Sequence, residues 1–312
     1  MKAKRMSEEI GTSNETGVAQ APPAAHAEPG SLYVVATPLG NARDLTLRAL
    51  DILRSVDLVA AEDTRLSAPL LRRYGIAVRL LSLNAHNEDA RARTIADALA
   101  KGQSVAVITD AGTPGISDPG ARLVRAVRDA GHGVVPIPGP SAVAAALSVA
   151  GIEAARFAFL GFLPPQAKAR RALLDSVAAL PLALVLYEAP HRVRATVDAL
   201  LEVLDGTRAL IVARELTKLH ETITRVPLVD APAWFAGDAN RERGEFVLIV
   251  DAPAGRTAHV ESVTPEAELW LRALLAELPP ARAARVVAAA TGASRDVLYA
   301  RALALKPDAE RP

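Results

Sequence analysis

The sequence contains no cysteine, few aromatic residues and almost no net charge. The absence of cysteine excludes a disulfide scaffold, a thiol nucleophile, an iron–sulfur cluster and a cysteine-ligated zinc site. Aromatic residues make up 4% of the chain, which disfavours a binding surface built from many stacked rings. The formal net charge is +1, so any contact with nucleic acid must come from a local patch rather than from the whole chain.

Long hydrophobic runs and compact sets of metal ligands are also missing. The longest run of small and apolar residues, 142–150, is far shorter than the roughly 20 residues that span a bilayer. No apolar export segment is seen near the N-terminus, so we expect a soluble, cytoplasmic protein with no membrane contact. The six histidines form no HExxH motif, and we expect no metal site.

Half of the residues are hydrophobic, and a chain of 312 residues predicts about two domains. Residues 1–30 are polar and rich in proline and alanine, which predicts a disordered tail. Residues 31–152 alternate between apolar runs of strand length and helix-like segments. The expected strands are 32–36, 57–61, 80–83, 104–109 and 134–137, and the expected helices are 46–55, 67–74, 88–101, 120–130 and 141–150. This alternation predicts an α/β domain with a mostly parallel sheet, in which strand 57–61 lies beside the first strand.

A second pattern covers residues 153–252. Its expected strands are 158–162, 182–187, 210–213, 222–226 and 246–250, and its expected helices are 166–179 and 191–204. The later strands follow one another closely, which favours antiparallel pairs and a mixed second sheet. Residues 264–306 are expected to form a helical extension, in which Gly292 and Ser294 end one short helix and begin the next, as in a helix-turn-helix.

Three unusual loops follow strands of the first predicted domain: residues 37–41, 109–120 and 136–142. Ligands bind at the carboxyl ends of strands in open α/β sheets, so these loops predict a cleft there. None of them is a GxGxxG or Walker loop, which leaves dinucleotide and nucleoside triphosphate binding without their usual support. The alternative interpretation is a set of tight turns, with Asp118 and Ser141 serving as helix caps.

Four charged clusters offer acids, bases and anchoring groups: residues 62–65, 86–88, 188–192 and 214–221. Helix caps and surface ion pairs are the alternative for each of them. No Gly-x-Ser-x-Gly elbow indicates a hydrolase.

The loops and clusters together resemble the ribosomal RNA small subunit methyltransferase I branch of the tetrapyrrole methylase superfamily. The matching segments are 36–41, 61–65, 109–120, 138–142, 161–164, 187–192 and 213–218. The likeness runs in order from residue 32 to residue 250, and the helical tail also fits this branch. It implies a two-domain tetrapyrrole-methylase-like fold, a homodimer, S-adenosylmethionine as methyl donor and 2′-O-methylation of a cytidine in the decoding region of 16S rRNA.

The resemblance also assigns site residues. By position, six residues match cofactor contacts of the superfamily: Leu39, Asp110, Thr113, Ser141, Ala142 and Glu188. Neighbouring residues complete the predicted cofactor site: Pro38, Gly40, Ala111, Gly112, Pro114 and Tyr187. We expect the segment of Glu62, Asp63 and Arg65 to face the acceptor ribose as the catalytic group. Glu188 and His191 are further candidates for the base, and Arg65, Arg192 and Lys218 for holding phosphate.

Two other functions remain open on the sequence. A methylase of precorrin-type tetrapyrroles would share the fold and the cofactor, although such enzymes carry a GxGxG-like first loop where this chain has 37–40. A non-enzymatic nucleic-acid-binding regulator would use residues 280–305 as a helix-turn-helix. The C-terminal extension carries five cations (Arg282, Arg285, Arg295, Arg301 and Lys306) against Asp296 alone. It is expected to contact RNA phosphates, with packing on the body as the alternative.

Overall fold

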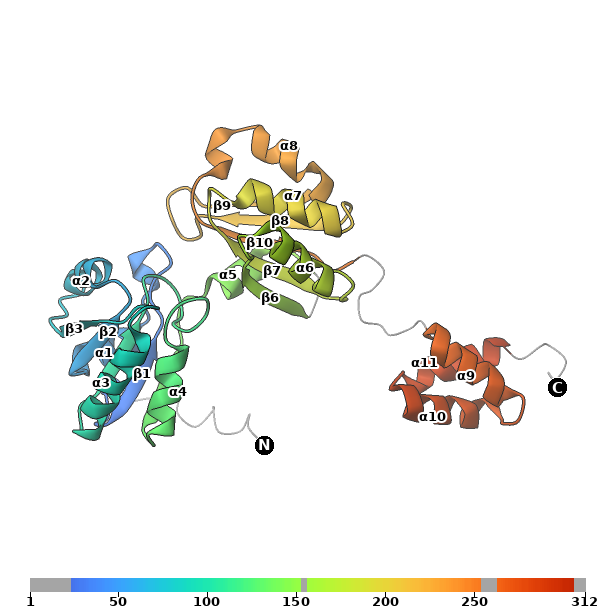
Figure 1. Cartoon of the computed structure of the whole chain (residues 1–312), viewed down its shortest axis with the longest axis horizontal. Helices are drawn as coiled ribbons and strands as arrows, with labels where there is room; N and C mark the ends of the chain where they lie inside the picture. Colours follow the sequence, from blue (N-terminus) through green and yellow to red (C-terminus); the bar gives the residue numbers. More distant parts are fainter. Residues whose placement is uncertain (1–23, 153–155, 254–262, 306–312) are drawn as a thin grey trace, which may run out of the picture.

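The computed structural model describes residues 24–152, 156–253 and 263–305, which form two α/β domains and a group of three helices (Figure 1). Residues 1–23 of the predicted tail, residues 1–30, lie outside the described residues. From Ala24 onward the chain runs against the first helix: Ala25 N–H donates to Asp51 Oδ2 at 3.0 Å, and Ala27 N–H donates to Ser55 Oγ at 3.0 Å.

The first sheet is parallel throughout, with strand order β3-β2-β4-β1-β5. Its strands are β1 (Ser31–Val35), β2 (Leu58–Ala61), β3 (Arg79–Ser82), β4 (Val105–Ile108) and β5 (Gly133–Ile137). The parallel arrangement confirms the prediction. The expected neighbour of the first strand was wrong, because β4 lies between β1 and β2. Both β2 and β4 are buried along their whole length, so their hydrophobicity is equally compatible with either position.

Helices cover both faces of this sheet. They are α1 (Leu47–Ser55), α2 (Thr64–Arg73), α3 (Glu88–Ala100) and α4 (Ala121–Asp129), preceded by a 3-10 turn η1 (Ala42–Asp44). Because side chains alternate along a strand, Val35 and Val59 pack with α1 and α2, whereas Leu32 and Val107 pack with α3 and α4. Residues 37–41, 109–120 and 138–142, which follow β1, β4 and β5, contribute no side chain to either core.

The second sheet is mixed, with strand order β6-β7-β10-β8-β9, and only β6 and β7 run parallel. Its strands are β6 (Phe157–Phe162), β7 (Ala183–Glu188), β8 (Ala209–Arg214), β9 (Thr222–Pro227) and β10 (Phe246–Val250). One face is covered by α6 (Ala167–Val177), α7 (Val193–Val203) and the short α8 (Ala231–Ala236), which the sequence did not predict. The other face receives α5 (Ala142–Val149), so the loop between β5 and α5 passes from the first domain to the second.

The C-terminal helices α9 (Pro265–Leu275), α10 (Pro280–Thr291) and α11 (Arg295–Leu305) enclose a small apolar core of their own. Gly292, at φ +71°, ends α10 in a left-handed conformation that glycine adopts readily, and α11 begins three residues later. The predicted helix-turn-helix is therefore present. None of the helices in the described part of the chain is long and apolar enough to cross a membrane.

Candidate functional site

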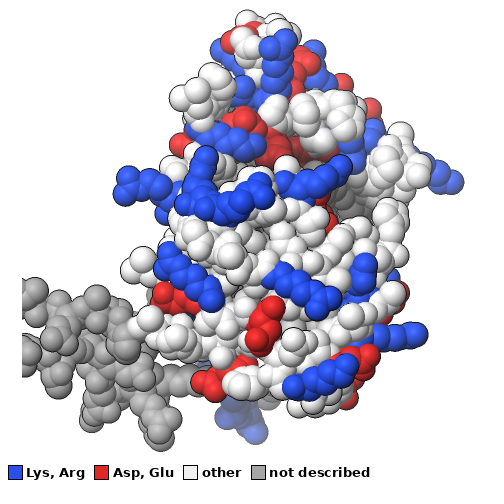
Figure 2. All heavy atoms as spheres, turned by 90° about the vertical axis from the view of Figure 1, so that its left-hand side faces the viewer, with Lys and Arg blue, Asp and Glu red and all other residues white. Residues whose placement is uncertain are grey.

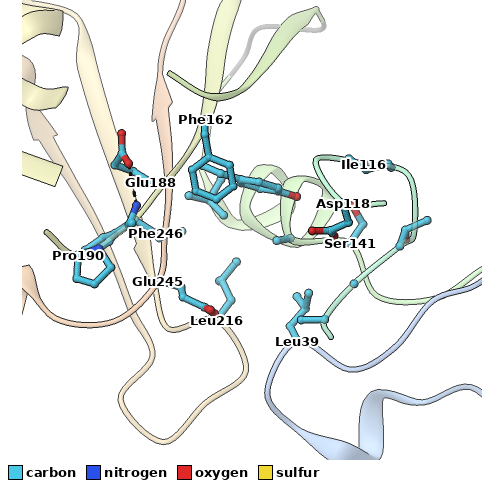
Figure 3. Close-up of a pocket in the computed structure, with 18 residues that line it drawn as sticks. Leu39, Ile116, Asp118, Ser141, Phe162, Glu188, Pro190, Leu216, Glu245 and Phe246 are labelled. Carbon is cyan, nitrogen blue, oxygen red and sulfur yellow. Dashed lines mark hydrogen bonds between the residues drawn. The ribbon is translucent and has the colours of Figure 1, made fainter. Parts of the chain in front are cut away.

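A cavity lies where the loops of the first sheet meet the second domain (Figure 3). Its volume is about 320 Å³, at the lower end of the roughly 300–1,000 Å³ typical of small-molecule sites. Eight residues of the predicted cofactor site line it: Leu39, Ala111, Gly112, Thr113, Ser141, Ala142, Tyr187 and Glu188. The other four, Pro38, Gly40, Asp110 and Pro114, are not among the lining residues.

Hydrogen bonds join the three predicted loops into one wall. Thr37 N–H donates to the Gly112 carbonyl at 2.8 Å, and Gly112 N–H donates back to the Thr37 carbonyl at 3.0 Å. Thr113 Oγ1 donates to the Pro140 carbonyl at 3.0 Å and thereby connects the third loop. Gly112 has φ +80°, and a Cβ there would lie 3.4 Å from Leu39 Cδ2, so glycine permits both the turn and the close approach. The wall is thus held by backbone hydrogen bonds between the first two loops and by the Thr113 hydroxyl between the second and the third.

The second domain contributes an apolar and aromatic wall that sequence reasoning largely missed. Phe162, Leu216 and Phe246 line the cavity together with Tyr187. The rings of Phe162 and Tyr187 meet edge to face, with centroids 5.7 Å apart. Phe162 and Leu216 fall within the matching segments 161–164 and 213–218, but their side chains carry no reactive group that would have drawn attention to them. Such surfaces suit a flat, apolar ligand group.

An acidic side chain, Asp118, faces the cavity beside Ser141 (Figure 3). Burial raises the pKa of Asp118 to about 6, and the nearby charges of Glu62 and Asp110 add to this shift. No described residue donates a hydrogen bond to its carboxylate. Ser117, immediately before it, is held at φ +66°, an uncommon conformation for a residue other than glycine. The sequence allowed Asp118 as a helix cap, whereas the structure leaves its charge available to a cationic ligand.

The predicted catalytic residues Glu62, Asp63 and Arg65 are not among the lining residues, and the Glu62 carboxylate is near enough to Asp118 to act on its charge. Glu62 accepts a hydrogen bond from Asp110 N–H at 3.3 Å, and burial raises the pKa of Glu62. Asp63 caps α2: its carboxylate accepts from Arg65 N–H at 2.8 Å and pairs with the Arg65 guanidinium at 2.6 Å. These hydrogen bonds lower the pKa of Asp63 to about 2. Glu62 is therefore the better placed of the two carboxylates to take up a proton.

Most of the other charged candidates are occupied by internal contacts. Glu188 is buried and accepts hydrogen bonds from Thr196 Oγ1 at 2.6 Å and Ala189 N–H at 2.8 Å. Arg192 pairs with Glu188 and donates to the Leu163 carbonyl, so it is not free to hold phosphate. His191, by contrast, is exposed and outside the cavity lining.

Glu88, from the predicted cluster 86–88, is the first residue of α3, and its side chain caps the start of α4. Its buried carboxylate accepts from the backbone N–H groups of Gly120, Arg122 and Leu123 at the start of α4. Burial alone would raise the pKa of Glu88, but these hydrogen bonds lower it. Its role is to fix the end of the loop that carries Asp118.

Two family models match the chain. The model of tetrapyrrole (corrin/porphyrin) methylases matches residues 31–232, and the model of the RsmI C-terminal HTH domain matches residues 261–306. The chain is 46% identical over 274 residues to the ribosomal RNA small subunit methyltransferase I of Escherichia coli O157:H7, covering 88% of this chain and 95% of the relative. It is 47% identical over 272 residues to the protein of the same name from Xylella fastidiosa, covering 87% and 98%.

Solved structures of more distant proteins share the fold. The uroporphyrin-III-C-methyltransferase of Thermus thermophilus matches with a TM-score of 0.52 at 23% identity, over 71% of this chain and 94% of that protein. The methyltransferase CobJ matches with a TM-score of 0.56 at 21% identity, over 72% and 95%. At these identities the likeness establishes the two-domain architecture alone.

Proposed function

The chain belongs to the tetrapyrrole methylase family, in its ribosomal RNA small subunit methyltransferase I branch, and from this we propose that it methylates a ribose of 16S rRNA. It is an enzyme of the methyltransferase class. We propose further that the acceptor is the 2′-hydroxyl of a cytidine in the decoding region, which rests on the family likeness, and that S-adenosylmethionine is the donor. The observation that supports this donor is the cavity between the two domains, which combines apolar walls with an anionic side chain.

The lining of the cavity fits S-adenosylmethionine. When bound, this cofactor supplies an electrophilic methyl group on a positively charged sulfonium. Leu39, Leu216 and Phe162 offer apolar surface for its adenine, and the Asp118 carboxylate offers a counter-charge for its cationic groups. We propose these residues, with Thr113 and Ser141, as the cofactor site.

The acceptor ribose hydroxyl is a weak nucleophile and needs a base. We propose that Glu62 takes the hydroxyl proton while the new oxygen–carbon bond forms and the sulfur–carbon bond breaks. Its raised pKa and its place beside Asp110 and Asp118 support this role.

The test is methyl transfer from labelled S-adenosylmethionine to small ribosomal subunits that lack this methyl group. We expect one labelled 2′-O-methylcytidine in 16S rRNA and no label in precorrin-type compounds. Label on the tetrapyrrole would favour the first alternative function. A protein that binds nucleic acid but transfers no methyl group to any acceptor would favour the regulator.

An arginine-rich surface on the first domain supports RNA as the substrate. The side of the molecule that carries α2 and β3 in Figure 1 faces the viewer in Figure 2 and displays many basic side chains. Six exposed arginines lie on η1, α1, α2 and β3: Arg43, Arg48, Arg54, Arg72, Arg73 and Arg79. None of them forms an ion pair with a described carboxylate. Arg54 Nη2 donates to the Tyr74 carbonyl at 3.4 Å, so α1 and the end of α2 form one continuous surface.

The triple variant Arg48→Gln, Arg72→Gln and Arg73→Gln is expected to weaken binding of small subunits several-fold. Because three cations that face phosphate are neutralised, the dependence of log affinity on log salt should flatten by about 2. Fluorescence titrations at several salt concentrations measure both quantities. The matched control replaces three exposed arginines on the opposite side of the sheet, Arg93, Arg125 and Arg128, and should behave as wild type. Equal losses in the two variants would contradict a specific RNA surface.

The C-terminal cations form a smaller patch than the sequence predicted. Arg301 pairs with Glu268 at 2.7 Å, which offsets its charge, and Lys306 lies outside the described residues. Arg282, Arg285 and Arg295 are exposed. Val286 and Leu303 are 43% and 51% exposed, because one face of each helix is sufficient for the small core. We propose that the exposed surface that carries Arg282, Arg285 and Arg295 contacts RNA.

Deleting residues 264–312 is expected to lower affinity for the small subunit roughly tenfold and to flatten its salt dependence, because the exposed cations Arg282, Arg285 and Arg295 are removed. Cofactor affinity, measured by calorimetry, should stay unchanged, since no residue of this segment lines the cavity. Sedimentation of the same variant checks the proposed homodimer, which should persist. A truncated protein that methylates subunits as well as the full chain would contradict the RNA role.

A further inference from the structure

Two loops from different domains meet at one side of the cavity. The loop after β1 (residues 37–41) lies against the loop after β8 (residues 215–221), and we call this pair the clasp. Asn41 N–H donates to Thr217 Oγ1 at 3.0 Å. Gly40 packs directly on the Lys218 side chain: a Cβ at position 40 would lie 2.3 Å from Lys218 Cγ. Only glycine permits this approach.

Lys218 is fully engaged within the second domain. Its Nζ lies 2.9 Å from Glu215 Oε1 and 2.8 Å from Glu245 Oε2. These contacts raise the pKa of Lys218 despite its partial burial, which acts in the opposite direction. A cation already paired with two carboxylates is poorly suited to hold phosphate, the role that its charge suggested.

The loop that presents Lys218 is conformationally strained. Glu215 and Thr217 have φ values of +52° and +65°, and a β-branched threonine rarely adopts such a conformation. Hydrogen bonds hold the loop in place: Thr217 N–H donates to Glu221 Oε2 at 2.6 Å, and Glu245 N–H donates to Glu215 Oε1 at 2.9 Å. Strain that is maintained by surrounding contacts is a recurrent feature of functional sites.

The clasp connects two walls of the cavity. Leu39 precedes Gly40, and Leu216 lies between Glu215 and Thr217; both leucines line the cavity, as does Glu245 (Figure 3). The distance between the two apolar walls is therefore set where Gly40 rests on Lys218. Any shift of one loop relative to the other displaces a leucine on which the ligand packs.

We propose that Lys218 is a positioning residue for cofactor binding: its side chain, seated on Gly40 and held by Glu215 and Glu245, fixes the spacing of Leu39 and Leu216. The inference rests on the proposed function, in that the cavity is taken to bind S-adenosylmethionine. Lys218 itself does not line the cavity and acts only through its neighbours.

The test compares Gly40→Ala, Lys218→Ala and the double variant in the full-length protein. Gly40→Ala is expected to raise the KM for S-adenosylmethionine and its calorimetric Kd about tenfold. The kcat at saturating cofactor should stay within twofold of wild type, and the unfolding midpoint of the free protein should stay within a few degrees. Lys218→Ala should raise KM several-fold, and adding Gly40→Ala to it should have little further effect, because the obstructing Cγ is gone.

A second pair of variants tests the clasp even where Gly40→Ala does not fold. Thr217→Ala should raise KM several-fold, and Thr217→Ser, which keeps the hydroxyl acceptor, should restore it. Lys168→Ala, an exposed lysine on α6, is the control and should leave KM unchanged. Unchanged KM in the folded Gly40 and Thr217 variants, or additive effects in the double variant, would overturn the clasp. Wild-type protein that binds no S-adenosylmethionine would instead overturn the proposed function.

Discussion

Replacing Asp118 by asparagine is expected to weaken S-adenosylmethionine binding by roughly 10- to 100-fold. The substitution keeps the size of the side chain and removes its charge, and a hydrogen bond to a charged group contributes about 1.5–3 kcal/mol. Asp118 lines the cavity, and no described residue offers its carboxylate a hydrogen bond, so the charge is free to meet a cationic ligand. Calorimetry with purified protein at pH 7.5 measures the loss.

The pH dependence of binding provides a second measurement on the same variant. With a pKa of about 6, Asp118 is largely ionised at pH 7 and largely protonated at pH 5. Affinity should therefore fall as the pH is lowered through 6, and this dependence should be nearly absent in Asp118→Asn. The groups that face Asp118 are Glu62, Asp110 and Tyr187. All three have raised pKa values, and the two carboxyl groups, Glu62 and Asp110, take up protons as the pH is lowered, as Asp118 does.

Asp118→Asn should also stabilise the free protein. A carboxyl group whose pKa is raised in the folded state stabilises the fold fully only below its unfolded pKa of about 3.8. That contribution is lost as the pH rises through the folded value of about 6. At pH 7.5 the buried, ionised carboxylate therefore lowers the free energy of unfolding. Asparagine removes this cost, and the unfolding midpoint should rise. Asp129→Asn is the matched control, because Asp129 is an exposed residue of α4 that does not line the cavity; an equal loss of affinity in that variant would contradict the assignment.

The sequence allowed the strands, most helices and the loops that line the cavity to be predicted. Buried strands such as β4, with Val105 through Ile108, are continuous apolar runs, and the loops after them carry glycine and proline at turns. These signals are local. The order of the strands depends on contacts between distant segments of the chain. The sequence therefore did not reveal that β4 lies between β1 and β2, and β2 was predicted to lie beside β1. The helix α8 spans six residues and contains Pro232, too short and too interrupted for a helical pattern to be visible.

The side chains that face the cavity were harder to predict than its loops. Asp118 could equally have been a helix cap, and only its place between two domains distinguishes the roles. Lys218 was a candidate for holding phosphate, but its ammonium group is paired with Glu215 and Glu245. The second pairing could not be predicted, because Glu245 lies 27 residues further along the chain. Phe162 and Leu216 became part of the site through packing, which no single residue type indicates. Charge partners and apolar walls depend on contacts between distant segments, whereas turn geometry depends on neighbours.

Replacing Glu62 by glutamine is expected to lower kcat by about 100- to 10,000-fold, the usual contribution of a positioned general base. Burial raises the pKa of Glu62, which makes its carboxylate a stronger proton acceptor than an exposed one. Its only hydrogen bond from a described residue is the one from Asp110 N–H, so it retains lone pairs for a substrate hydroxyl. Cofactor affinity should remain near that of wild type, since Glu62 is not among the residues that line the cavity.

Asp63→Asn separates this role from that of the neighbouring carboxylate. With a pKa of about 2 and its oxygens bonded to Arg65, Asp63 is a weak base, and its amide variant should lose far less of kcat than Glu62→Gln. Single-turnover methylation of small subunits at saturating cofactor measures the chemical step in both variants. If Glu62→Gln keeps more than about a third of the wild-type rate, or if Asp63→Asn loses more than Glu62→Gln does, the proton passes to another acceptor. Because both variants place a carboxamide where the carboxylate stood, such an outcome would concern the chemistry and not the packing of the loop.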